Sequence, residues 1–278
     1  MTRASEGGLA RPIGFIDSGV GGLTVLHECL VSLPGEDFLY LGDSDYFPYG
    51  TKTVDELRER VGIVTSFLLE RGVKMLVVAC NSATATAGEE IARIAAGAGV
   101  PVVTVIGPES EIAATITETG RVGVLATPAT VSSGAYRAAL DRLGRPLTVT
   151  EVAAPDLAPL IQEGSPFDED VMDMVRSYCE PLKKAEIDTL VLGCTHYPLV
   201  APMLQRLLGR DVRLVTAGHA IAAAVQRTLA ADGSLSTERQ EGDYRFLVTG
   251  DLDSFVEVGT RFLQLPLAGR IESVSVER

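Results

Sequence analysis

The chain is poor in cysteine. Its 278 residues include only four, at Cys29, Cys80, Cys179 and Cys194, and no two of them form a CxxC pair. This number and spacing do not fit the disulfide framework of a small secreted protein. We therefore expect reduced thiols and a cytoplasmic location.

Clusters of basic residues and long apolar runs are also missing. The formal net charge is −13 at pH 7, so we expect neither nucleic acid nor an anionic membrane surface as a partner. No stretch approaches the roughly 20 apolar residues of a membrane span, and we expect no membrane association. The polar, glycine-containing residues 1–10 are expected to form a flexible tail.

Short apolar runs alternate with stretches of helical periodicity. Apolar residues make up 46% and charged residues 22% of the chain, as in ordinary globular proteins. Runs at 13–16, 38–41, 75–79 and 101–106 predict strands, and helix-spaced leucines after the first run predict a helix. This alternation is typical of a parallel sheet with helices on both faces.

The second half of the chain partly repeats the first. The run GVLAT at residues 123–127 matches GFIDS at 14–18, and EIDTLVLGC, which ends at Cys194, matches GVKMLVVAC, which ends at Cys80. Such duplication predicts an α/β fold of two pseudo-symmetric lobes, with mostly parallel sheets flanked by helices. We expect residues 11–105 and 214–278 to form the first lobe and residues 106–213 the second.

Polar side chains follow three of the predicted strands. In open α/β sheets, ligands bind outside the carboxyl ends of the strands, where helix N-termini favour anions and lower the pKa of a thiol. We therefore expect an active site between the lobes. The three polar segments are Asp17-Ser18, Cys80-Asn81-Ser82 and Cys194-Thr195-His196.

Two of the cysteines are candidates for chemistry. Cys29 and Cys179 lie within helical patterns, which predicts buried packing residues, whereas Cys80 and Cys194 end matching strands. A thiolate on one face of a carbon acid and a thiol on the other can invert that centre. His196 could be a proton relay or a structural histidine, and Asp17 could cap a helix or orient a substrate ammonium.

The residues alone allow two other interpretations of the site, as a dinucleotide-binding site or as a zinc site. The turn DSGVGG resembles a dinucleotide-binding loop with Asp43 placed for a ribose hydroxyl, but the third glycine position is Thr24. Cys80, Cys194 and His196 together would also suit zinc, although no further ligand cluster supports a metal.

Five segments in the same order resemble the glutamate racemase family of the aspartate/glutamate racemase superfamily. This resemblance implies two α/β lobes and conversion of L-glutamate to D-glutamate for peptidoglycan precursors. It also implies no cofactor, glutamate as the small-molecule partner, and a homodimer. The segments are IGFIDSGVGGLTVL, PYG, VVACNSATA, GVLATPATVSSGAY and LVLGCTHYPLV.

The resemblance also implies roles for single residues. Cys80 would act on the D-enantiomer and Cys194 on the L-enantiomer, with Asp17 and His196 as auxiliary groups. No metal ligand is implied. The substrate-binding residues would be Asp17, Ser18, Tyr49, Gly50, Asn81, Ser82, Thr195 and His196.

The chain departs from the family pattern at several positions. Gln162 stands where the family commonly has a glutamate, whose carboxylate would assist the second cysteine. Glu163 is the next residue. Ser82 replaces threonine and keeps the hydroxyl. Other departures are Gly107, Ala154 and Thr216-Ala217. An aspartate or hydantoin racemase, a maleate isomerase and a non-catalytic amino-acid-binding module remain alternatives.

Overall fold

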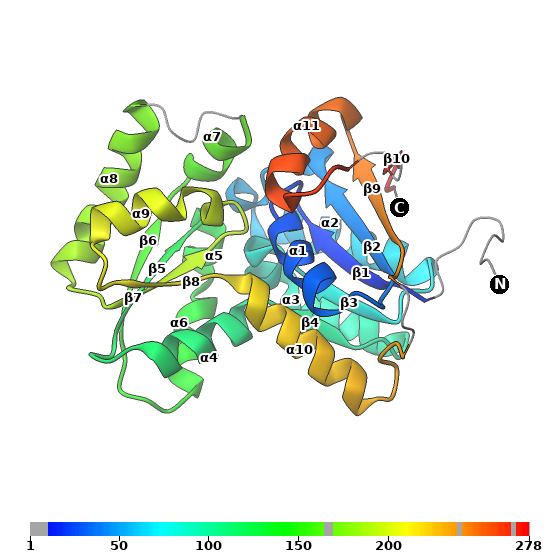
Figure 1. Ribbon diagram of the computed structural model, residues 1–278, viewed down its shortest axis with the longest axis horizontal. Helices are drawn as coiled ribbons and strands as arrows, with labels where there is room; N and C mark the ends of the chain where they lie inside the picture. Colours follow the sequence, from blue (N-terminus) through cyan, green and yellow to red (C-terminus); the bar gives the residue numbers. More distant parts are fainter. Residues whose placement is uncertain (1–10, 164–168, 238–240, 268–270, 278) are drawn as a thin grey trace.

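The strands form two separate parallel sheets (Figure 1). The computed structural model describes residues 11–163, 169–237, 241–267 and 271–277, so the predicted tail at 1–10 lies outside the described residues. The six-stranded sheet has the order β10-β9-β2-β1-β3-β4 and the four-stranded sheet the order β6-β5-β7-β8. The strands are β1 Ile13–Asp17, β2 Phe38–Asp43, β3 Met75–Val78, β4 Val102–Thr104, β5 Arg121–Ala126, β6 Thr148–Ala153, β7 Thr189–Gly193, β8 Arg213–Val215, β9 Tyr244–Thr249 and β10 Ile271–Ser273.

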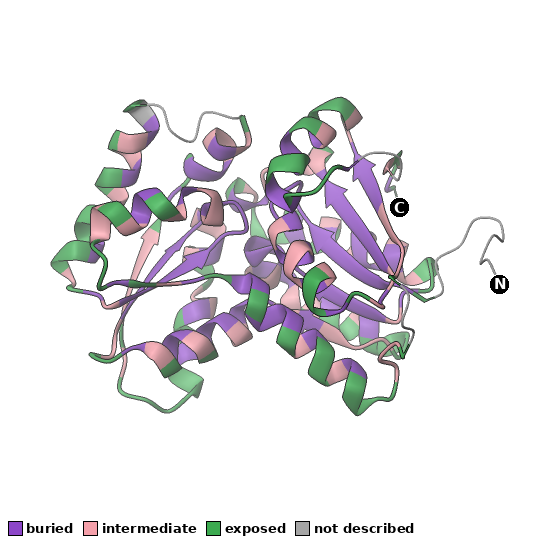
Figure 2. Ribbon diagram, in the orientation of Figure 1, coloured by how far each residue is buried: buried purple, intermediate pink, exposed green. Residues whose placement is uncertain are grey.

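Helices flank both sheets (Figure 1). Their outward faces are exposed, while the central strands of both sheets are buried and the edge strands β6, β8 and β10 are partly exposed (Figure 2). The α-helices are α1 Leu23–Ser32, α2 Val54–Glu70, α3 Asn81–Gly97, α4 Ile106–Ile116, α5 Pro128–Ser133, α6 Ala135–Arg142, α7 Leu157–Glu163, α8 Glu169–Lys184, α9 Ala201–Leu208, α10 Ala217–Ala231 and α11 Leu252–Leu263.

Successive residues of the first strands pack against opposite layers. Phe15 and Tyr40 belong to the core cluster that includes α1, α10 and α11, whereas Ile16 and Leu41 belong to the cluster that includes α2 and α3. Because neighbouring side chains of a strand point to opposite faces, a strand covered on both faces must be apolar throughout. The uninterrupted apolar runs of the sequence have this cause.

The two sheets share one strand order. β2-β1-β3-β4 in the first sheet corresponds to β6-β5-β7-β8 in the second, and every pairing is parallel. The predicted α/β class with two similar lobes is therefore confirmed. β9 and β10 extend the first sheet beside β2, while β8 pairs with β7 in the second. The lobe boundaries at 105/106 and 213/214 stay predictions.

One predicted element is shorter than expected. β4 ends at Thr104, and α4 begins at Ile106, which the apolar pattern placed in the strand. Pro108 is compatible with this, because the first turn of a helix leaves its backbone N–H groups unpaired in any case. Among the described residues, no helix combines the length and apolar character needed to cross a membrane.

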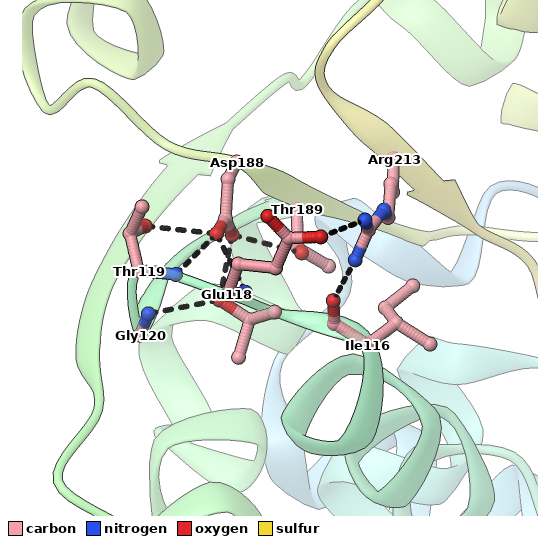
Figure 3. Close-up of polar contacts among 8 residues, drawn as sticks. Ile116, Glu118, Thr119, Gly120, Asp188, Thr189 and Arg213 are labelled. Carbon is pink, nitrogen blue, oxygen red and sulfur yellow. Dashed lines mark hydrogen bonds and ion pairs between the residues drawn. The ribbon is translucent and has the colours of Figure 1, made fainter.

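Asp188 forms hydrogen bonds with the loop that precedes β5, at the amino end of the second sheet (Figure 3). Its carboxylate accepts hydrogen bonds from Thr117 Oγ1 at 2.6 Å, from the backbone N–H groups of Glu118 at 2.8 Å and Thr119 at 2.6 Å, and from Thr189 Oγ1 at 3.0 Å. Desolvation alone would raise the pKa of Asp188, but these hydrogen bonds outweigh it and lower the pKa well below its usual range. The folded state thus favours the ionised carboxylate.

We predict that Asp188→Asn lowers the free energy of unfolding by about 1–3 kcal/mol at pH 7, because the amide cannot accept from all these donors. A depressed folded-state pKa stabilises the fold above the unfolded value of about 4 and ceases to do so as the pH falls. Urea unfolding at pH 7 and pH 3 should therefore show the gap between wild type and variant narrowing in acid. Equal stability at pH 7 would contradict this role.

Candidate active site

The carboxyl ends of the central strands of both sheets meet at one pocket. About 380 Å³ of empty space, part of it continuous with solvent, lies among its lining residues. This is the position at which open α/β sheets bind ligands, since helix N-termini and strand ends converge there. The pocket is lined by Ser18, Phe47, Pro48, Tyr49, Gly50, Thr51, Cys80, Asn81, Ser82, Thr127, Pro155, Ala158, Pro159, Cys194, Thr195 and His196.

Cys80 lies directly before α3 and is its N-cap. Its Sγ accepts a hydrogen bond from the backbone N–H of Ala83 at 3.5 Å and lies 3.9 Å from Ser18 Oγ. Burial, with a smaller contribution from the charge of Asp17, raises the pKa of the Cys80 thiol to about 12. The expected lowering by the helix N-terminus is therefore outweighed, because desolvation of a thiolate costs more than the backbone hydrogen bonds return.

Cys194 follows β7 but does not cap an α-helix. A 3-10 turn at Tyr197–Val200 comes first, and α9 begins only after it. The Sγ atom lies 3.9 Å from Nδ1 of His196. Burial raises the pKa of Cys194 well above its usual range, so this thiol also holds its proton in the free protein.

His196 connects Cys194 to Gln162. Burial lowers the pKa of His196 to about 3, which leaves the imidazole neutral at pH 7. Its Nε2 lies 3.0 Å from Gln162 Oε1, so the Nε2–H donates and the Nδ1 lone pair faces the Cys194 thiol. Gln162 lies on α7, whereas the neighbouring Glu163 is exposed. The structure thus places Gln162, not Glu163, against the second cysteine's histidine.

Asp17 lies behind the pocket wall, fully buried. Its Oδ1 accepts from the backbone N–H of Gly19 at 3.0 Å, and its Oδ2 accepts from Thr195 Oγ1 at 3.3 Å, which joins the two lobes. Burial raises the pKa of Asp17 to about 6, against the hydrogen bonds from Gly22 and Gly19. Asp17 does not cap α1, whose N-cap is Gly22.

The other predicted binding residues line the pocket. Tyr49 donates its hydroxyl to Asp43 Oδ2 at 2.6 Å, and Ser82 Oγ lies 2.8 Å from Thr127 Oγ1. Thr127 was not predicted as a site residue, although the repeat aligns it with Ser18 and could have indicated it. Phe47, Pro155, Ala158 and Pro159 carry no such signal, because they enter the pocket from loops and a helix start.

Asp43 is committed to neighbouring side chains. Arg60 binds both of its oxygens, Tyr49 donates to Oδ2, and Thr249 donates to Oδ1 at 2.9 Å. A carboxylate with these partners is not free for a ribose hydroxyl, so the dinucleotide interpretation loses its acidic residue. Within the described ranges, no group of three or more His, Cys, Asp or Glu side chains is placed to hold a metal ion.

The glycines of the DSGVGG turn have a packing role instead. A Cβ atom on Gly21 would lie 2.3 Å from Thr195 Oγ1 and 2.5 Å from His196 Nδ1. A Cβ atom on Gly22 would lie 2.7 Å from Asp17 Cβ. Only glycine lets the first lobe approach the second cysteine's segment this closely.

The sequence is similar to those of known racemases. The sequence profile of the Asp/Glu/Hydantoin racemase family matches residues 24–225. The chain belongs to this family. A glutamate racemase from Bacillus cereus is 39% identical over 259 residues, which cover 93% of this chain and 95% of that protein. The predicted resemblance to glutamate racemases, and with it the predicted enzyme class, is confirmed.

Solved structures of this family share the fold. A glutamate racemase isoform from Bacillus anthracis superposes with a TM-score of 0.89 at 35% identity, over 95% of this chain and 97% of that one. A glutamate racemase from Francisella tularensis in complex with D-glutamate gives a TM-score of 0.89 at 32% identity, over 96% and 98% of the two chains.

We predict that Gly21→Ala lowers kcat/KM of the racemase reaction by roughly 100-fold, because the added methyl group displaces His196 and Thr195 and small misplacements of reacting groups are costly. Gly88→Ala in α3 is the matched control, since nothing lies within 4 Å of its added Cβ. Steady-state kinetics and thermal denaturation compare the two variants. Unchanged activity in Gly21→Ala would show that the lobes need not approach this closely.

Proposed function

We propose that this protein interconverts L- and D-glutamate by a two-base mechanism that uses Cys80 and Cys194 and no cofactor. The observation that carries the proposal is the arrival of two buried thiols at one pocket from equivalent strands, β3 and β7, of the two sheets. A binding module has no need of paired thiols, whereas inversion of a carbon acid needs a base on one face and an acid on the other.

The proton balance is closed by the two sulfur atoms. The Cys194 thiolate removes the α-proton of L-glutamate and becomes a thiol, while the Cys80 thiol donates its proton to the opposite face and becomes a thiolate. The product is D-glutamate, and the reverse reaction exchanges the two roles. No electron transfer or leaving group is involved.

The two thiols have different polar neighbours. His196 Nδ1 faces the Cys194 thiol and can take its proton, while the His196 Nε2–H stays hydrogen-bonded to Gln162 Oε1. Cys80 Sγ contacts Ser18 Oγ, and the charge of Asp17 raises the pKa of Cys80, so protonation of Asp17 would favour the Cys80 thiolate. The substrate ammonium adds a positive charge that also stabilises a thiolate.

The pocket can hold a small dicarboxylate without Lys or Arg. No lining residue has a cationic side chain at pH 7, because His196 is neutral there. The donors are the hydroxyls of Ser18 and Ser82 and the backbone N–H groups at the start of α3. Hydroxyl and backbone donors suit carboxylates in a buried pocket because they introduce no unpaired charge.

The family resemblance supports the wider assignments. We propose that the D-glutamate serves peptidoglycan precursors, that the enzyme works in the cytoplasm, and that it forms a homodimer. Racemisation of aspartate or a hydantoin, isomerisation of maleate, and amino-acid binding without catalysis are the alternative functions. The first three are distinguished by the substrate that is converted, and the last by binding without conversion.

The deciding experiment incubates the purified protein with L-glutamate in deuterated water without added cofactor. Polarimetry and proton NMR should show racemisation with deuterium at the α-carbon of the product. Cys80→Ala and Cys194→Ala should each lower racemisation by at least roughly 10²–10⁴-fold, because each removes an acid–base group. Cys179→Ala, which changes a buried cysteine of α8, is the control and should remain active.

The outcomes separate the alternatives. Full activity in either Cys80→Ala or Cys194→Ala would overturn the two-base mechanism. Turnover of L-aspartate, a hydantoin or maleate in place of glutamate would favour another member of the superfamily. Binding of glutamate without α-deuteration would indicate a non-catalytic module.

We predict that Gln162→Glu raises kcat from L-glutamate by roughly tenfold, because a carboxylate beside Nε2 favours the imidazolium and a pKa rise of one unit corresponds to a tenfold easier protonation. Glu163→Gln changes the exposed neighbour and is the control. The two variants are compared by circular dichroism at saturating substrate. A loss of activity in Gln162→Glu would mean that the site requires the neutral amide.

A further inference from the structure

Glu109 is a buried carboxyl group that the proposed reaction does not use. It lies in the first turn of α4 and has no solvent exposure. Its Oε2 accepts hydrogen bonds from Asn81 Nδ2 at 3.0 Å and from the Tyr136 hydroxyl, while its Oε1 has no partner among the described residues. Asn81 belongs to the first helix turn after Cys80, so the contact joins the two sequence repeats at the pocket.

This contact determines which way the Asn81 amide points. The nitrogen donates to Glu109 Oε2 and also to the Tyr136 hydroxyl oxygen at 2.7 Å, and these two acceptors lie side by side. The Tyr136 hydroxyl gives its own hydrogen to Glu109, so its oxygen can only accept from Asn81. With these donors and acceptors, the Asn81 nitrogen faces Glu109 and Tyr136, and its oxygen bonds to neither of them.

The Asn81 oxygen has no protein partner among the described residues. Asn81 lines the pocket beside Cys80, and its Oδ1 is buried without a hydrogen-bond partner in the described part of the chain. An ammonium group has three N–H donors and no acceptor, so it is matched by carbonyl oxygens and repelled by amide N–H groups. A reversed Asn81 would present its NH₂ group to the substrate ammonium instead.

Glu109 acts here without a charge. Burial raises the pKa of Glu109 to about 8, against the hydrogen bonds from Tyr136 and Asn81, and a proton on this carboxyl must lie on Oε1, because Oε2 accepts both hydrogen bonds. A neutral hydrogen-bonding group of the same shape should therefore replace it. An apolar group should not, because it offers the Asn81 nitrogen no acceptor.

Resting on the proposed function, we propose that Glu109 is a positioning residue that orients the Asn81 amide so that Oδ1 accepts a hydrogen bond from the substrate ammonium. Tyr136 shares this task as the second acceptor for the Asn81 nitrogen. Glu109 itself does not touch the substrate. Its effect on binding must therefore pass through Asn81.

The test compares two replacements of Glu109 in the full-length enzyme. Glu109→Leu should raise KM for L- and D-glutamate roughly tenfold, the scale of one lost hydrogen bond to a charged group, with a smaller change in kcat. Glu109→Gln retains an acceptor and should keep KM within about threefold of wild type. Thermal denaturation of both variants, with Asp188→Asn as a destabilised control distant from the pocket, separates binding from stability.

A double-mutant cycle tests the route through Asn81. Asn81→Ala should raise KM by itself, and adding Glu109→Leu should raise it no further, because the group that Glu109 orients is gone. Tyr136→Phe provides a second variant if Glu109→Leu does not fold, and its smaller rise in KM should also vanish in Asn81→Ala.

The outcomes distinguish the two levels of the proposal. Wild-type protein that does not racemise glutamate would overturn the proposed function and this inference with it. An active wild type, combined with an unchanged KM in Glu109→Leu or with additive effects in the cycle, would overturn the positioning role alone. Loss of binding in Glu109→Gln equal to that in Glu109→Leu would do the same.

Discussion

Burial of two protonated thiols between the sheets is the constraint on which the rest of the site depends. Desolvation raises the pKa of both Cys80 and Cys194, so neither becomes a nucleophilic base by itself. Each thiol therefore needs a partner that can take its proton inside the same buried region. We propose His196 for Cys194 and the Asp17 region for Cys80, and both Asp17 and His196 are buried.

The lobes build this region jointly. Hydrogen bonds cross between them: Thr195 donates to Asp17, the Ser82 and Thr127 hydroxyls bond to each other, and Asn81 donates to Glu109 and Tyr136. Glycine at position 21 removes the side chain that would keep Thr195 and His196 at a distance. The close approach of the lobes thus buries the two thiols and orients the polar groups around them.

The duplicated fold carries an asymmetric site. β3 and β7 hold equivalent places in sheets of the same strand order, yet Cys80 caps a long helix while Cys194 precedes a 3-10 turn. The Cys80 thiol contacts the Ser18 hydroxyl, whereas the Cys194 thiol contacts the neutral imidazole of His196. This difference fits a reaction whose two proton transfers start from opposite enantiomers.

Local patterns in the sequence determined the alternation of strands and helices, the repeat, and the placement of Cys80 and Cys194 at strand ends, because apolar periodicity follows directly from burial. Only the tertiary structure decided the contacts of Gln162 with His196 and of Glu109 with Asn81. Each pair is far apart in sequence, and helix or strand periodicity does not predict contacts between separate elements. The tertiary structure also decided that the pKa values of the two thiols are raised rather than lowered. A helix N-terminus is visible in the sequence, but the desolvation that outweighs it arises only when the two lobes pack together.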